Sequence, residues 1–192
     1  LEDARMPLVS FTGSTPVGRS VASTVAGRFG RTILELGGNN AVVLMDDADL
    51  DMAIPAILFG AVGTAGQRCT STRRVLVQRS IADDVVARLQ KAYAQVAIGD
   101  PMEAGTLCGP LISQGAVGDM QKALERAKQA GGEVVCGGEP IDGPGNFVKP
   151  AIVRARNDWD VVQEETFAPI LYIIDVEDVD DAIAKHNGVP QG

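Results

Sequence analysis

The chain has 192 residues, a length that suits one large domain or one domain with part of a second. Its hydrophobic (45%) and charged (22%) fractions are ordinary for a globular protein, and a formal net charge of −8 argues against a nucleic-acid surface, which needs basic residues. No apolar run approaches the roughly 18 residues of a membrane span, and residues 1–5 do not resemble the start of a signal peptide. We therefore expect no nucleic acid and no membrane as partners.

The first half of the chain alternates short apolar runs with helical stretches. In chain order, the pattern predicts a strand at 8–12, a helix from about 16 to 29, strands at 32–36 and 41–45, a helix from 50 toward 60, and a strand at 75–77. Ser14 or Thr15 suits the N-cap of the first helix, Pro16 suits its first turn, and Gly30 is its expected end. A glycine-punctuated stretch at 63–70 precedes the strand at 75–77.

After the strand at 75–77, the chain contains two long stretches with helical spacing. Their expected buried faces are Ile81, Val85, Leu89, Ala92 and Val96 in the first, and Val117, Met120, Leu124 and Ala127 in the second. Strands are predicted at 133–136, 152–153 and 170–176, with an exposed Gly/Pro-rich loop at 137–147 and a short helix at about 179–186.

This alternation of strands and helices predicts an α/β fold with a largely parallel sheet flanked by helices. A domain boundary is expected at Gly37-Gly38, which gives domains of residues 1–37 and 38–192. One strand–helix–strand unit cannot bury both faces of a parallel sheet. We therefore expect residues 1–37 to be the C-terminal remnant of a larger domain, and the second domain to be truncated at its C-terminus.

Two segments of the first domain combine strand ends with residues suited to ligands. Gly13 and Ser14 precede a helix whose free N–H groups and dipole favour an anion, although they also fit an ordinary capped helix. Glu35 interrupts an apolar strand and is followed by Gly37-Gly38, which allow close approach of a ligand. Its carboxyl is either paired, protonated or turned to a cleft, or it lies on the solvent face of the strand.

The three cysteines, Cys69, Cys108 and Cys136, have the number and spacing of neither a disulfide framework nor a zinc site. This usage favours a reducing compartment, and we expect a cytoplasmic protein without a metal. Cys69 follows Arg68 in a glycine-rich loop, where positive charge and turn N–H groups favour a thiolate, although a lone cysteine is more often inert. Cys108 and Cys136 adjoin apolar residues and are expected to be packing residues.

A charged segment, Glu164-Glu165-Thr166-Phe167-Ala168-Pro169, precedes the strand at 170–176. Carboxylates can bridge ribose hydroxyls, and an aromatic ring can pack on a flat heterocycle. The same residues also fit a charged loop with a core phenylalanine. His186, the single histidine, lies near the end of the last predicted helix and is expected to be structural.

Taken together, four segments resemble the aldehyde dehydrogenase superfamily over essentially the whole chain. They are Phe-Thr-Gly-Ser-Thr (11–15), Leu-Glu-Leu-Gly-Gly (34–38), Gly-Gln-Arg-Cys-Thr (66–70) and Glu-Glu-Thr-Phe-Ala-Pro (164–169). Residues 38–41 and 61–69 further resemble the antiquitin-like branch, in which Asn39 stands where many other branches have lysine. That branch oxidises α-aminoadipic semialdehyde, which is in equilibrium with piperideine-6-carboxylate, in lysine catabolism.

The resemblance implies a fold and a mechanism. Residues 1–37 would be the last strand–helix–strand of a Rossmann-like cofactor domain, and 38–192 would be the catalytic domain. Cys69 would attack the aldehyde to form a thiohemiacetal and then a thioester, with its backbone N–H serving an oxyanion hole. Glu35 would activate the water that hydrolyses the thioester.

The resemblance also implies binding residues and partners. Arg68 would meet a carboxylate of the aldehyde substrate, and the parent enzyme would be a homo-oligomer. Full-length members have an upstream Asn in the oxyanion hole and a Lys near the adenosine ribose, so we expect this chain alone to be nearly inactive. The positions near NAD, with NADP left open, are Gly13, Ser14, Glu165 and Phe167.

Two other functions remain as alternatives. One is a non-catalytic scaffold or interaction module on the same fold, in which Cys69 would react with iodoacetamide no faster than Cys108 or Cys136. The other is a thiol esterase that uses no nicotinamide, in which ester hydrolysis would not respond to NAD.

Overall fold

The computed structural model describes residues 1–191, which form two compact units that divide between Gly38 and Asn39. The first unit contains strand β1 (Leu8–Thr12), helix α1 (Thr15–Gly27) and strand β2 (Arg31–Glu35). The two strands are parallel, with Thr12 opposite Glu35. Alternate strand residues are half-buried and exposed, which is the pattern of a sheet covered by a helix on one face.

Helix α1 ends differently from the prediction that Gly30 stops it. The last helical residue is Gly27, and the left-handed conformation belongs to Phe29, with φ of 58°. The N–H of Gly30 donates to the carbonyl of Val25 (3.0 Å). The prediction was wrong because the left-handed position, which glycine often takes after a helix, comes one residue before Gly30. Phe29 takes it with its side chain 98% exposed, outside the packed part of the unit.

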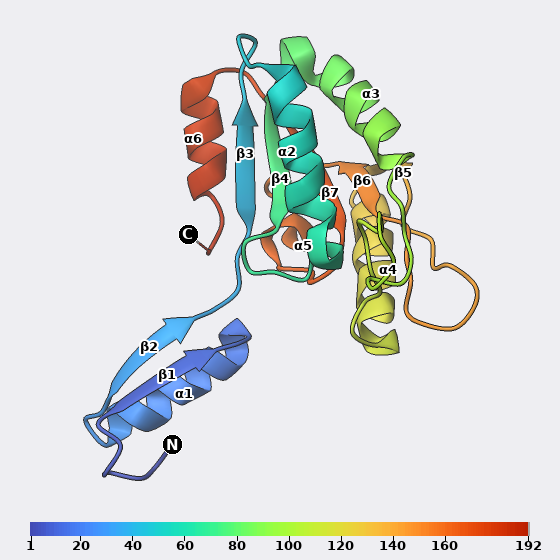
Figure 1. Ribbon diagram of the computed structural model, residues 1–192. Helices are drawn as coiled ribbons and strands as arrows, with labels where there is room; N and C mark the ends of the chain where they lie inside the picture. Colours follow the sequence, from blue (N-terminus) through green and yellow to red (C-terminus); the bar gives the residue numbers. More distant parts are fainter. Residues whose placement is uncertain (192) are drawn as a thin grey trace. The chain divides into compact units, whose positions relative to one another are not determined.

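The second unit is a five-stranded sheet with helices on both faces (Figure 1). The strand order is β3-β4-β7-β6-β5, and β5 alone among these strands runs antiparallel to its neighbour. Within residues 1–191, no helix is long and apolar enough to cross a bilayer. The strands are β3 (Asn40–Leu44), β4 (Thr72–Gln78), β5 (Glu133–Cys136), β6 (Ala151–Arg154) and β7 (Ile170–Val176). The helices are α2 (Leu50–Val62), α3 (Ala82–Tyr93), α4 (Gln114–Gln129), α5 (Asp160–Gln163) and α6 (Val179–Asn187), with 3-10 turns at Gly63–Gly66 and Arg79–Ile81.

The core lies in two apolar layers, one on each face of this sheet. Successive side chains of β4 point to opposite faces of the sheet, so Leu76 packs in one layer while Val75 and Val77 pack in the other. Helices α2 and α3 cover the layer of Val75, and α4 and α6 cover the layer of Leu76 (Figure 1). The predicted helix faces are confirmed where they are deepest, at Val85, Leu89, Met120 and Ala127.

Three neighbouring parallel strands, β3, β4 and β7, begin at the same edge of the sheet. In register, Asn40 pairs with Thr72, and Arg74 pairs with Tyr172. The segments that lead into these strands therefore lie at the edge formed by the amino ends of the strands. They are residue 39 before β3, residues 69–71 before β4 and residues 164–169 before β7. Ligands of open α/β sheets usually bind beyond the carboxyl ends of strands, so this edge is an unusual place for two functional motifs to meet.

Candidate active site

The loop that carries Cys69, residues 63–71 and here named the thiol loop, leaves helix α2 through a left-handed turn. Thr64, Ala65 and Gly66 have φ values of 55°, 51° and 68°. The left-handed conformation costs side-chain-bearing residues about 1–2 kcal/mol each, and such strain clusters at functional sites. Cys69 follows the turn and is exposed, so the turn leads the chain from the buried end of α2 to an accessible thiol.

The other two cysteines have different surroundings. Cys108 is fully buried, and burial raises the pKa of its thiol to about 11, so this thiol is protonated at neutral pH. Cys136 is half-buried, and desolvation raises its pKa as well. Their burial agrees with the packing roles expected for them, and Cys69 is the exposed thiol of the described chain.

Amide side chains hold the backbone of the thiol loop. Asn40 Nδ2, at the start of β3, donates to the carbonyl oxygens of Cys69 (2.6 Å) and Ser71 (3.0 Å). Gln67 Nε2 donates across to the carbonyl of Pro110 (3.3 Å). Neither amide was predicted to be a site residue, yet the two hold the backbone on both sides of the thiol.

Gly66 brings the thiol loop against the segment that precedes β7, residues 164–169 and here named the pre-β7 segment. A β-carbon on Gly66 would lie 2.5 Å from the carbonyl oxygen of Ala168 and 2.7 Å from the nitrogen of Pro169. Contacts this short are essentially absent from proteins, so only glycine fits. Two of the four predicted motifs therefore pack directly on each other.

We expect Gly66→Ala to lower the free energy of unfolding by about 2–4 kcal/mol, from left-handed strain and overpacking together. The matched control is Gly118→Ala in α4, where nothing lies within 4 Å of the added β-carbon. That change should raise the free energy of unfolding by about 0.5–1 kcal/mol. Urea unfolding of the two variants measures both effects, and a Gly66→Ala variant as stable as wild type would contradict the contact.

Arg73, on β4, joins the two motifs through a buried guanidinium. Its side chain is 4% exposed and makes an ion pair with Glu165 (Nη2 to Oε1, 3.3 Å). The same Nη2 donates to the carbonyls of Gly66 (3.3 Å) and Arg68 (3.2 Å), and Nη1 donates to the carbonyl of Thr166. Burial lowers the pKa of Arg73, and the nearby Glu165 carboxylate acts in the opposite direction. Arg73 was not among the site residues predicted from the sequence.

The pre-β7 segment places an acid and an aromatic ring beside Arg73. Glu165 is 18% exposed, and Phe167 is 46% exposed with its ring centre 5.6 Å from the Arg73 guanidinium carbon. The alternative that Phe167 is a core residue is therefore wrong. Glu164 pairs instead with Arg126 on α4 (2.6 Å), which lowers the pKa of the Glu164 carboxyl. The two adjacent acids thus have different partners.

Arg68, the residue before Cys69, packs its side chain against helix α2. Its guanidinium carbon lies 5.6 Å from the ring centre of Phe59. Gly63 leaves the space for this arrangement, because a β-carbon there would lie 2.3 Å from Arg68 Nη2. The Nε atom is buried without a hydrogen-bond partner. Arg68 is thus held next to the thiol loop by ring stacking and shape.

The remaining predicted site residues, Gly13, Ser14 and Glu35, lie in the first unit. Ser14 is the N-cap of α1, and its hydroxyl makes no capping hydrogen bond. Gly13 donates its N–H to the carbonyl of Glu35 (3.0 Å), and a β-carbon on Gly13 would lie 2.5 Å from the Phe11 ring. Glu35 is exposed at the end of β2. The three residues meet at the carboxyl ends of β1 and β2.

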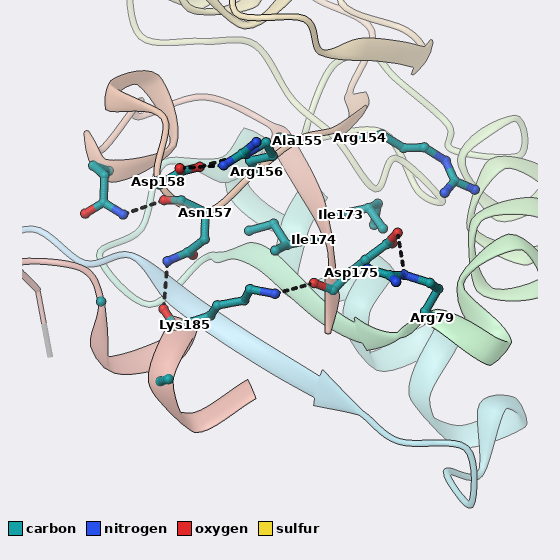
Figure 2. A pocket seen from close by; sticks show the side chains of 13 residues that line it. Arg79, Arg154, Ala155, Arg156, Asn157, Asp158, Ile173, Ile174, Asp175 and Lys185 are labelled. Carbon is teal, nitrogen blue, oxygen red and sulfur yellow. Dashed lines mark hydrogen bonds and ion pairs between the residues drawn. The ribbon is translucent and has the colours of Figure 1, made fainter. Parts of the chain in front are cut away.

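A cavity of about 710 Å³ lies elsewhere in the second unit, lined by β7, α6 and the connection from β6 to α5 (Figure 2). Charged side chains of its lining have partners within the lining, since Arg156 pairs with Asp158 (2.9 Å) and Lys185 Nζ donates to the backbone carbonyl of Asp175 (2.8 Å). None of the predicted site residues lines it. The cavity is therefore separate from the candidate active site.

Comparison with solved structures places the fold. Lactaldehyde dehydrogenase from Escherichia coli matches with a TM-score of 0.94 and 33% identity, over 98% of this chain and 40% of that chain. Betaine aldehyde dehydrogenase from Staphylococcus aureus in complex with NAD+ matches with a TM-score of 0.94 and 31% identity, over 97% of this chain and 38% of that chain. The predicted α/β fold with a largely parallel sheet is confirmed.

Sequence comparison agrees. Bos taurus α-aminoadipic semialdehyde dehydrogenase is 52% identical over 192 residues, which are 100% of this chain and 36% of that protein. Aldehyde dehydrogenase family 7 member A1 of Brassica napus is 50% identical over 100% of this chain and 39% of its own length. The chain thus spans less than half the length of these relatives. The aldehyde dehydrogenase family model matches residues 1–192, so the chain belongs to the aldehyde dehydrogenase family.

Proposed function

We propose that the natural protein containing this chain oxidises an aldehyde to a carboxylate with NAD(P), using Cys69 as nucleophile. The observation that carries this proposal is the packing of the thiol loop on the pre-β7 segment, through Gly66 and Arg73. This packing supports the proposal because the loop that carries the exposed thiol lies against the segment that carries Glu165 and Phe167. A thiol nucleophile beside a cofactor-binding acid suits aldehyde oxidation and has no purpose in a scaffold.

The chemistry of the proposal takes place on the sulfur of Cys69. The thiolate attacks the carbonyl carbon, and the resulting oxyanion accepts a hydrogen bond from the backbone N–H of Cys69. Loss of hydride from the thiohemiacetal leaves a thioester, and the nicotinamide supplies the hydride acceptor when it is bound. Glu35 takes a proton from the water that hydrolyses the thioester, which releases the carboxylate and restores the thiol.

The residues proposed to hold the cofactor fit such a group. The Ser14 hydroxyl makes no capping bond, and it stands at the start of the 13-residue helix α1, where an anionic pyrophosphate is favoured. A β-carbon on Gly13 would lie 2.5 Å from the Phe11 ring, so glycine leaves the backbone there open to a ligand only while that ring keeps its position. Glu165 presents a carboxylate for ribose hydroxyls, and the exposed ring of Phe167 is available to pack on a flat heterocycle.

We propose α-aminoadipic semialdehyde as the substrate, in lysine catabolism, with Arg68 binding its distant carboxylate. A guanidinium can bind a carboxylate through two parallel hydrogen bonds, and Arg68 immediately precedes the nucleophile. The relative named for this substrate is 52% identical to the chain. The buried Nε of Arg68, which lacks a partner, adds an unsatisfied donor on the same side chain.

The proposal extends to the domains and the setting. Residues 1–37 would belong to the cofactor-binding domain and residues 38–192 to the catalytic domain. A polypeptide of these 192 residues alone would turn over slowly, because the relatives are more than twice as long. We further propose that the natural protein is a homo-oligomer and that it works in the cytoplasm, where the free thiol of Cys69 stays reduced.

The test is NADH formation by the natural full-length protein with α-aminoadipic semialdehyde, alongside the 192-residue polypeptide. We expect turnover by the full-length protein with NAD and little by the short one. NADP in place of NAD reports the cofactor preference. Ester hydrolysis that ignores NAD, with no aldehyde oxidation, would support a thiol esterase. Absence of both activities would support a scaffold, and either result would overturn the proposal.

A further inference from the structure

One nitrogen of Arg73 contacts both halves of the candidate site. Within residues 1–191, Nη2 lies 3.2–3.3 Å from three acceptors, which are the carbonyls of Gly66 and Arg68 and the carboxylate of Glu165. A guanidinium nitrogen of this type carries two hydrogens. Three acceptors therefore share two hydrogens, and any change at one acceptor alters the bonds to the other two.

The surroundings make these shared bonds strong. The Arg73 side chain is 4% exposed, and hydrogen bonds to an ionised group are stronger than neutral ones when water is excluded. Two acceptors, the carbonyls of residues 66 and 68, belong to the backbone directly before Cys69. Electrostatic interaction with the Cys69 sulfur also favours the charged form of Arg73, although burial acts more strongly against it. The guanidinium is thus coupled to the thiol both by its backbone bonds and by its charge.

We propose that Arg73 is a positioning residue that couples occupation of the cofactor ribose site at Glu165 to the placement of Cys69. The inference rests on the proposed function, because it takes Glu165 as the carboxylate that accepts ribose hydroxyls. When those hydroxyls donate to Glu165, the carboxylate accepts less strongly from Nη2, and the hydrogen bonds from Nη2 to the carbonyls of Gly66 and Arg68 become stronger. The backbone before the nucleophile is then held more firmly once the cofactor is bound.

Lysine in place of Arg73 would keep the charge and lose the coupling. Its ammonium is a single compact donor group, and it cannot reach Thr166 with one nitrogen while another serves Gly66, Arg68 and Glu165. It would also lose the flat contact with the Phe167 ring. Arg73→Lys therefore removes the shared hydrogen bonds of the guanidinium while it keeps the positive charge of the side chain.

The experiment measures the rate at which iodoacetamide alkylates Cys69 in the natural full-length protein, with and without saturating NAD. The matched control is Arg74→Lys. Arg74 is also fully buried on β4, but it donates to the carbonyl of Asn39 and to Asn157, and to neither motif. We expect NAD to change the wild-type rate about fivefold or more, within the usual range of coupling between sites. The ratio of the alkylation rates with and without NAD should be the same in Arg74→Lys as in wild type. In Arg73→Lys this ratio should approach one.

Other outcomes separate the inference from the proposed function. Calorimetry that detects no NAD binding to wild type would overturn the proposed function. NAD binding that leaves the alkylation rate of wild type unchanged would mean that the two sites are not coupled. The wild-type ratio of rates in folded Arg73→Lys would mean that NAD only shields Cys69. Either result would overturn the role of Arg73. If Arg73→Lys does not fold, Glu165→Gln weakens the same bond from its more exposed partner. A wild-type ratio in Glu165→Gln at saturating NAD would equally overturn the inference.

Discussion

Cys69→Ser is expected to lower aldehyde turnover by about 10⁴–10⁶-fold, the usual cost of removing a covalent nucleophile. The physical reason is ionisation. A serine hydroxyl stays protonated at neutral pH. The polar side chains that hold the thiol loop are the amides of Asn40 and Gln67 and the guanidinium of Arg73, and none of them can act as a base for the hydroxyl. NADH formation by the full-length variant measures the loss, and NAD affinity should remain at the wild-type value.

The control for this change is Cys136→Ser. Cys136 is half-buried at the end of β5, and its thiol pKa is raised by desolvation, so it is not expected to react at neutral pH. Turnover by Cys136→Ser should match wild type. Retention of turnover in Cys69→Ser, or its loss in Cys136→Ser, would move the nucleophile away from position 69.

Glu35→Gln is expected to lower steady-state turnover by about 10²–10⁴-fold, the usual contribution of a general base. Glutamine has nearly the same shape as glutamate but takes no proton from water, so thioester hydrolysis slows while the earlier steps proceed. A rapid burst of NADH, comparable in amount to the enzyme, should therefore precede the slow phase. Stopped-flow absorbance of NADH separates the two phases.

Glu133→Gln is the matched control for Glu35→Gln. Glu133 is another exposed glutamate carried by a strand, at the start of β5. Its substitution should leave both kinetic phases unchanged. Loss of the burst in Glu35→Gln would show that the carboxyl acts before hydride transfer, which contradicts its proposed part in hydrolysis.

The elements of the fold were largely predictable because apolar spacing reports burial. The helices at 82–93 and 114–129 follow from side chains that recur every three or four residues. The expected side chains within the helices are buried except Ala92, which is half-buried, while Ile81 and Val96 lie outside the first helix and are half-buried. Strand β4 was predicted too short, at 75–77 instead of Thr72–Gln78. The missing residues include Arg73 and Arg74, which are buried although charged. Charged residues are rarely fully buried without a partner, and several partners of these two arginines, such as Glu165 and Asn157, come from distant parts of the chain.

The candidate site also has a part that could be predicted from the sequence and a part that could not. Cys69, Glu165 and their neighbouring motifs were found through a family resemblance, since each residue alone also had an ordinary interpretation. Arg73 was not predicted as a site residue, because the acceptors of its hydrogen bonds come close to it only in the folded chain. These acceptors belong to residues 66, 68, 165 and 166. One signal was present: two arginines next to a continuous apolar run, which is costly to bury without partners. That cost could have marked both arginines as bonded residues.

The most direct test of the account is to map the covalent adduct in full-length Glu35→Gln after it is mixed with aldehyde and NAD. Peptide mass spectrometry should find the acyl group as a thioester on Cys69, with Cys108 and Cys136 unmodified. An adduct on another residue, or NADH production with no adduct on any cysteine, would contradict the assignment of Cys69 as the nucleophile.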